Sequence, residues 1–192
     1  MTDAALADDA APERSSRRAL LGAGVIGAAM ALARSGTAAA STSGLSDDDL
    51  AQVGFAISLE LTARDLYDAA IAGGADDPLW GVMREQHEAY AQRLAGISGI
   101  SADTRNDAVY DALEGAFTAG DPAGAAFDLE NTAAATHVEL LGAVSDPEPA
   151  AAIASIAAIE SRHATVLAGL SGQGGDFDAL FLNTATALSP EA

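Results

Sequence analysis

The chain has 192 residues, with 28 acidic side chains, 9 basic ones and no cysteine, and every basic residue is an arginine. The net charge of −19 argues against nucleic-acid binding, because phosphate recognition needs a basic surface. The absence of cysteine excludes disulfides, thiolate metal ligands and thiol nucleophiles. Alanine supplies about a quarter of the chain and aromatic residues only 5%, which favours closely packed helices over a sheet.

The N-terminal region has the order of an export signal. Arg17 and Arg18 precede an apolar stretch at 19–33, and small residues follow at 37–41. The apolar stretch is too short, and too rich in glycine and alanine, to span a bilayer. The paired arginines resemble a twin-arginine signal, which exports folded proteins. We therefore expect a signal peptide at 1–40 and a mature protein in the periplasm, the cell envelope or outside the cell, with no stable membrane span. The alternative is a basic, alanine-rich tail.

The remaining sequence predicts helices, because the period-two alternation of strands is absent. Ser46 with Asp49 marks one helix start, and aspartate–proline pairs or a capping aspartate mark the others. The expected helices cover about residues 46–72, 78 to 96–99, 104–119, 122–144 and 147–172. Residues 172–192, which begin with several glycines, are expected to form a loosely attached, flexible tail.

The lengths of the connections predict how these helices are arranged. Short connections make antiparallel hairpins of the first two long helices and of the last two. The connection at about 98–121 is long and contains a short helix of its own. The predicted fold is therefore an all-α four-helix bundle over residues 41–171, built from two antiparallel hairpins joined by a long crossover.

Each long helix carries an apolar stripe with three- and four-residue spacing, and each stripe is interrupted near its middle by glutamate or histidine. Burying an unpaired carboxylate costs roughly several kcal/mol, so these glutamates need a positive partner. Iron, manganese and zinc all accept carboxylate and imidazole ligands. Glu160 and His163, three residues apart on one helix, point the same way. The predicted metal ligands are Glu60, His87, Glu130, Glu160 and His163. His137 is interpreted as a core histidine bonded to Glu130 or to a neighbouring carboxylate.

This pattern resembles the ferritin-like superfamily, and in particular its exported, single-domain bacterial members, over residues 46–171. In that superfamily a di-metal site takes one glutamate from each of two helices and a Glu-x-x-His motif from each of the other two. The resemblance implies metal ligation by Glu60, by Glu130 and by the Glu160–His163 motif, and it implies iron or oxygen chemistry. Tyr67 matches a tyrosine that often lies near the metals.

The second helix departs from the motif, because Arg84 stands where the superfamily has a glutamate three residues before His87. If three carboxylates face Arg84, a net charge of about −2 remains, and an inward Arg64 would reduce it to about −1. We therefore expect one iron or manganese ion, or none, rather than a di-metal centre.

Two hypotheses follow from the sequence. The first is an exported ferritin-like protein with a degenerate carboxylate/histidine metal site. The second is a metal-free helical bundle with a structural, stress-related or partner-binding role, whose core is a salt-bridge network anchored by Arg84. The sequence identifies no protein partner, is compatible with a homo-oligomer and leaves enzymatic activity open.

Overall fold

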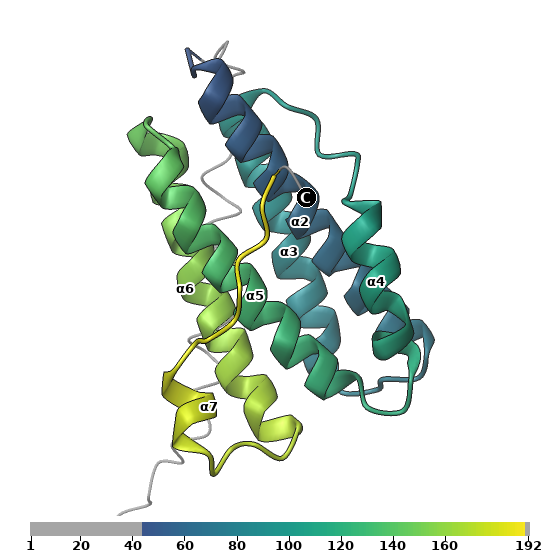
Figure 1. Ribbon diagram of the computed structural model, residues 1–192. Helices are drawn as coiled ribbons and strands as arrows, with labels where there is room; N and C mark the ends of the chain where they lie inside the picture. Colours follow the sequence, from purple (N-terminus) through teal and green to yellow (C-terminus); the bar gives the residue numbers. More distant parts are fainter. Residues whose placement is uncertain (1–43, 191–192) are drawn as a thin grey trace, which may run out of the picture. The chain divides into compact units, whose positions relative to one another are not determined.

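The computed structural model describes residues 44–190, and all of the regular structure in that range is helical. The predicted signal peptide at 1–40 lies outside the described residues. Figure 1 shows the described part as a bundle of long helices with a shorter helix at its side. The helices are α2 (Asp47–Ala72), α3 (Pro78–Ser98), α4 (Asp107–Thr118), α5 (Pro122–Ala143), α6 (Pro147–Leu170) and α7 (Phe177–Phe181).

The helix starts follow from the local sequence. The Ser46 side chain accepts a hydrogen bond of 3.1 Å from the backbone N–H of Asp49, which satisfies one free donor of the first turn of α2. Helices α3, α5 and α6 each begin with a proline, whose missing N–H costs nothing at that position. Gly99 ends α3 in the left-handed conformation, with a φ of 75°, which favours glycine.

The long helices pack as two antiparallel hairpins, α2 with α3 and α5 with α6. The hairpins meet where α3 contacts α6 and where α2 contacts α5, and α4 of the crossover packs against α2 and α5. This confirms the predicted all-α, ferritin-like bundle with a helix in its crossover. Among the described residues, no helix combines the length and the apolar character that crossing a membrane requires.

The segment after α6 is more closely attached than the sequence indicated. It forms the short helix α7 and then runs along α5, as Figure 1 shows. The Asn183 side chain donates a 2.7 Å hydrogen bond to the backbone carbonyl of Asn131. The backbone N–H of Leu188 donates a 2.9 Å hydrogen bond to the hydroxyl of Thr136. Both partners lie on α5, so the expectation of a loosely attached tail is corrected for residues 183–188.

Candidate metal centre

Six glutamate and histidine side chains from all four long helices meet in the middle of the bundle. Every one of them is at least 94% buried. Five were predicted as metal ligands, and the structure brings them together with a sixth, His137. The set consists of Glu60 on α2, His87 on α3, Glu130 and His137 on α5, and Glu160 and His163 on α6.

One half of this cluster is fully hydrogen-bonded. His87 lies between two carboxylates, with Nδ1 2.8 Å from Glu60 and Nε2 3.0 Å from Glu130. His163 places Nδ1 3.1 Å from the other oxygen of Glu130 and Nε2 2.6 Å from the amide oxygen of Gln86. The hydroxyl of Tyr67 donates a hydrogen bond of 2.5 Å to Glu130. Every polar atom of His87, Glu130 and His163 therefore has a partner.

The other half is left incomplete. His137 Nδ1 lies 2.9 Å from Glu160 and 3.0 Å from the backbone carbonyl of Ala133. Its Nε2 lies 3.4 Å from Glu60, which is an ion-pair distance without a hydrogen bond. The second oxygen of Glu160 also lacks a hydrogen-bond partner. A buried polar atom without a partner costs about 1–3 kcal/mol, so two of them in one place call for an explanation.

The six side chains form two groups that each have the donors for a metal ion. His87, Glu130 and His163 form one triad, and Glu60, His137 and Glu160 form the other. Within each triad the offered ligand atoms lie within 4.8 Å of one another. Two ligand atoms that each lie about 2.0–2.2 Å from one ion are at most about 4.4 Å apart, so atoms at the 4.8 Å limit would have to move slightly closer to hold an ion. Mixed imidazole and carboxylate donors suit iron, manganese and zinc.

A small cavity adjoins the incomplete triad. It has a volume of about 20 Å³, and its walls include Glu60 and Glu160. A space of this size holds roughly one water molecule or one small ligand atom. Two members of the incomplete triad, Glu60 and Glu160, thus line this cavity.

The pKa values in the cluster result from two opposing effects, burial and the charges of neighbouring side chains. Burial opposes the charged form of His87, but the charges of Glu130 and Glu60 outweigh it and hold the pKa of His87 well above its usual value. His137 behaves alike, and Glu160 raises its pKa to about 9 against the effect of burial. Burial raises the pKa of Glu160 to about 7, although His137 acts in the opposite direction. Histidine protons thus balance the carboxylates without metal.

Glu130 and Tyr67 lie in the hydrogen-bonded half of the cluster, and their pKa values shift in opposite directions. Burial alone would raise the pKa of Glu130, but the charges of His163 and His87 outweigh burial and lower it. Burial, with the charge of Glu130, holds the pKa of Tyr67 well above its usual value. Tyr67 is therefore a neutral hydrogen-bond donor to a carboxylate. This agrees with its predicted place beside the site.

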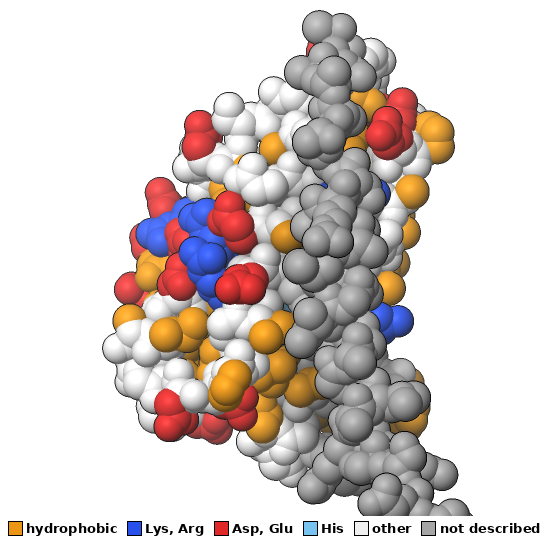
Figure 2. All heavy atoms as spheres, turned by 180° about the vertical axis from the view of Figure 1, so that it is seen from behind, with side chains coloured by type: hydrophobic (Ala, Val, Ile, Leu, Met, Phe, Trp, Pro, Cys, Tyr) orange, Lys and Arg blue, Asp and Glu red, His pale blue; other side chains and the backbone are white. Residues whose placement is uncertain are grey.

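The arginines do not enter the cluster, so the prediction for Arg84 is wrong. Its Nε atom lies 3.1 Å from Asp68, and its side chain is 35% exposed. Arg64 also turns outward, where it pairs with Glu88 at 2.7 Å and with Asp65 at 2.6 Å. From behind, arginine and acidic side chains are seen gathered on one flank of the molecule (Figure 2). Arg84 therefore does not offset the charge of the three buried glutamates.

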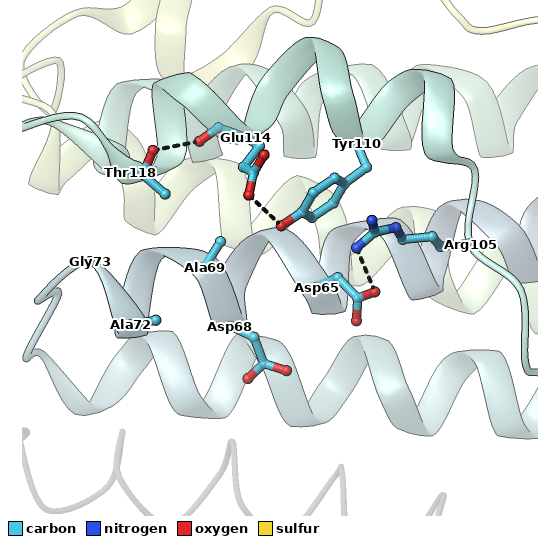
Figure 3. A pocket seen from close by; sticks show the side chains of 9 residues that line it. All are labelled: Asp65, Asp68, Ala69, Ala72, Gly73, Arg105, Tyr110, Glu114 and Thr118. Carbon is cyan, nitrogen blue, oxygen red and sulfur yellow. Dashed lines mark hydrogen bonds and ion pairs between the residues drawn. The ribbon is translucent and has the colours of Figure 1, made fainter.

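A hollow of the surface lies between α2 and α4 (Figure 3). It has a volume of about 550 Å³ and is open to solvent. Its charged side chains have partners in the chain: Arg105 binds Asp65 at 3.1 Å, and Tyr110 donates a hydrogen bond of 3.0 Å to Glu114. The guanidinium of Arg105 also stacks on the ring of Tyr110 at 3.4 Å. The hollow contains none of the cluster residues and offers no free ligand set.

Sequence reasoning missed Gln86 and gave His137 only a supporting part. Gln86 lies three residues after Met83 and four before Tyr90, so it fits the buried stripe of α3 as well as His87 does. That spacing was the available signal. His137 follows Glu130 by seven residues, or two helical turns, which places both on the same face of α5. Of the two partners considered for His137, the structure selects the neighbouring carboxylate, Glu160, and not Glu130.

Comparison with known proteins identifies the family of the chain. The sequence matches the ferritin-like domain family over residues 48–173, which is more than half of the chain and spans α2 to α6 apart from the first residue of α2. The chain belongs to the ferritin-like domain family. No curated protein and no solved structure matched it. This ferritin-like protein thus carries two buried carboxylate/histidine triads that can bind metal.

Proposed function

We propose that this protein is an exported ferritin-like protein that binds one divalent transition-metal ion, iron or manganese, through Glu60, His137 and Glu160. One observation carries the proposal: the two unpaired buried atoms of the cluster, on His137 and Glu160, belong to this triad. This triad contains His137, which was not among the ligands predicted from the sequence. His87, Glu130 and His163 become the hydrogen-bonded group beside the ion.

Charge favours the same choice. Two ionised carboxylates, Glu60 and Glu160, match the double charge of the ion, whereas the triad of His87, Glu130 and His163 contains one carboxylate. His87 connects the two groups, because it contacts both Glu60 and Glu130. The imidazolium of His87 orients Glu60 and neutralises Glu130. Metal binding then displaces protons from His137 and Glu160.

When bound, iron or manganese would supply redox and Lewis-acid chemistry. The contribution of the chain is to hold the three ligands in a dry interior, to keep Tyr67 hydrogen-bonded to Glu130, and to leave a small cavity beside Glu60 and Glu160. Three protein ligands beside such a cavity would leave room for a further ligand, which a catalytic site needs and a purely structural site lacks.

Elemental analysis tests the metal site. The purified protein is incubated anaerobically with Fe(II) or Mn(II), desalted and analysed for metal. We expect about one ion per chain, lost in His137→Gln and in Glu160→Gln. Glu88→Gln is the matched control, because this half-buried glutamate pairs with Arg64 outside the cluster. Retention of the ion in His137→Gln together with its loss in His163→Gln would assign it to the other triad instead. Two ions per chain would show that both triads bind.

Export has its own test. The arginine pair and the apolar stretch at 19–33 support a twin-arginine signal. We expect the protein to reach the cell envelope or the medium in cells with a functional twin-arginine pathway. Arg17→Lys with Arg18→Lys should retain it in the cytoplasm. Unchanged export of this double variant would contradict the proposal without affecting the metal site.

One observation favours a second candidate, the metal-free bundle with a structural or partner-binding role. Three buried histidines face three buried glutamates, and each histidine lies at ion-pair distance from a carboxylate without metal. The anchor of this network is histidine rather than Arg84. Absence of bound metal after loading, with an unchanged fold in chelator, would favour this candidate.

A further inference from the structure

A second, apolar groove lies beside the crossover helix. It has a volume of about 310 Å³ and is bordered by α2, α4, α5 and the C-terminal tail. Apolar side chains such as Phe55, Ala112 and Leu113 make most of its lining. Its volume falls at the lower end of the range for sites that bind small organic molecules. The groove is distinct from the charged hollow of Figure 3, which shares none of its lining residues.

This apolar groove is separated from the metal cluster by one layer of side chains. Four residues line both the groove and the 20 Å³ cavity that touches Glu60 and Glu160: Val109, Leu129, Thr132 and Leu188. They come from α4, from α5 and from the tail. A molecule in the groove would therefore lie one side chain away from the cavity of the proposed metal triad.

The tail supplies the outer part of this layer. Leu188 is half-buried, and its backbone is held by the hydrogen bond to Thr136, one residue before His137. Asn183 adds a second hydrogen bond from the tail to α5. The tail thus forms the outer wall between the groove and the cavity.

The charges around the groove restrict what it can bind. Asp128 places a carboxylate at its edge, and the chain as a whole carries a charge of −19. Both disfavour an anionic ligand, while the apolar lining disfavours a strongly polar one. We infer that the groove binds a small, uncharged, apolar organic molecule and presents it to the metal triad through the layer of Val109, Leu129, Thr132 and Leu188. The role as a substrate site rests on the proposed metal binding, whereas binding itself does not.

Indole, a small uncharged aromatic molecule, is the probe for binding to the metal-free protein. Methyl resonances of Val109, Leu129 and Leu188 report on the groove in carbon–proton correlation spectra. We expect saturable shifts at these methyl groups. Ala112→Trp should weaken binding at least about tenfold, because the added ring occupies the groove from an exposed position. The matched control is Ala116→Trp, one turn along α4, which is exposed and does not line the groove.

The absence of methyl shifts, or equal binding by both tryptophan variants, would overturn the inference. Indole-3-carboxylate tests the charge argument, and we expect it to bind at least about tenfold more weakly than indole. Equal affinity of the two compounds would contradict an uncharged ligand.

The Mn(II)-loaded protein tests the position of the ligand. We expect enhanced relaxation of indole protons in the loaded wild-type protein and not in Ala112→Trp. If Mn(II) binds and indole binds without enhanced relaxation, the groove does not serve the metal site. If Mn(II) fails to bind, the proposed function fails, and the groove is still decided by the experiments on metal-free protein.

Discussion

Helix α2 takes part in two charge networks that differ in their cations. On its outer face Arg64, Asp65 and Asp68 pair with one another or with α3 and the crossover, and every cation there is an arginine. On its inner face Glu60 contacts His87 and His137. Within the described part of the chain, the ion pairs of the inner network join histidine to glutamate and involve no arginine.

The difference lies in what each cation can give up. An arginine keeps its proton at any physiological pH, so the outer pairs are permanent and leave nothing for a metal to bind. A histidine can lose its proton and then offers a neutral nitrogen ligand. The inner network is therefore exchangeable, because an ion can replace protons on His137 and Glu160. The outer network is as rich in carboxylates, but it cannot make that exchange.

The largest expected effect comes from removing a carboxylate from each network. Glu130→Ala deprives Tyr67, His87 and His163 of their common partner and should destabilise the metal-free protein by about 3–5 kcal/mol. Glu88→Ala removes a partner of the half-buried Arg64 near the surface and should cost about 0–1 kcal/mol. Urea unfolding of both variants measures the two free energies. Equal losses would contradict the distinction between an inner and an outer network.

The histidines of the inner network and Glu88 of the outer network should respond to opposite ends of the pH scale, whereas Glu130, whose pKa is lowered, loses its contribution on acidification as Glu88 does. In the metal-free fold His137 has a pKa of about 9 against an ordinary 6.5, so the fold binds its proton more tightly than the unfolded chain does. This stabilisation is complete below about pH 6.5 and is lost as pH rises to about 9, by on the order of 3 kcal/mol. The raised pKa of Glu160 acts in the same direction at lower pH.

Glu88 behaves in the opposite way. Its hydrogen bond from Arg64 lowers its pKa below the ordinary 4.5, so its contribution is present above that pH and is lost on acidification. Melting temperatures of chelator-treated protein from pH 3 to pH 10 measure both losses of stability, the one at high pH (the alkaline limb) and the one at low pH (the acid limb). His137→Gln should reduce the loss of stability at alkaline pH, to which His87 also contributes, and leave the acid limb unchanged. An alkaline loss of the same size as in the wild-type protein would contradict the assignment.

The smallest effect is expected from Arg84→Glu. Since Arg84 pairs with Asp68 at the surface, the change places two like charges together and should cost about 1 kcal/mol or less. Metal content should stay the same as in the wild-type protein. Elemental analysis and urea unfolding of the variant check both statements. Increased metal uptake would show that Arg84 acts on the cluster after all.

The sequence predicted the bundle and the five ligand candidates because helical spacing carries that information. Buried apolar positions recur every three or four residues, so a glutamate or histidine in such a position is directed inward. Glu60 and Glu160 were located in this way. Their contacts could not be predicted, because the same stripe also accommodates Gln86 and because His137 had two carboxylates within reach.

The arginines show where such reasoning fails. Arg64 and Arg84 occupy helix positions close to the stripe, but long side chains can bend away from the axis of a bundle. Asp68, four residues after Arg64 on α2, and Glu88, four residues after Arg84 on α3, lie where these guanidinium groups can reach them from the opposite helix. The tail was misjudged for a related reason, since its hydrogen bonds join positions 52 residues apart and leave no local pattern.

The inner contacts also bear on how the helices find their places. Followed from Gln86 to Glu160, they pass from α3 to α6, α5, back to α3, then to α2, α5 and α6. Much of the surrounding core is alanine, whose small side chains interlock weakly and would tolerate a helix that slides along its neighbour. A slip of one turn would separate these contacts all at once. These polar contacts therefore fix the register of all four long helices relative to one another.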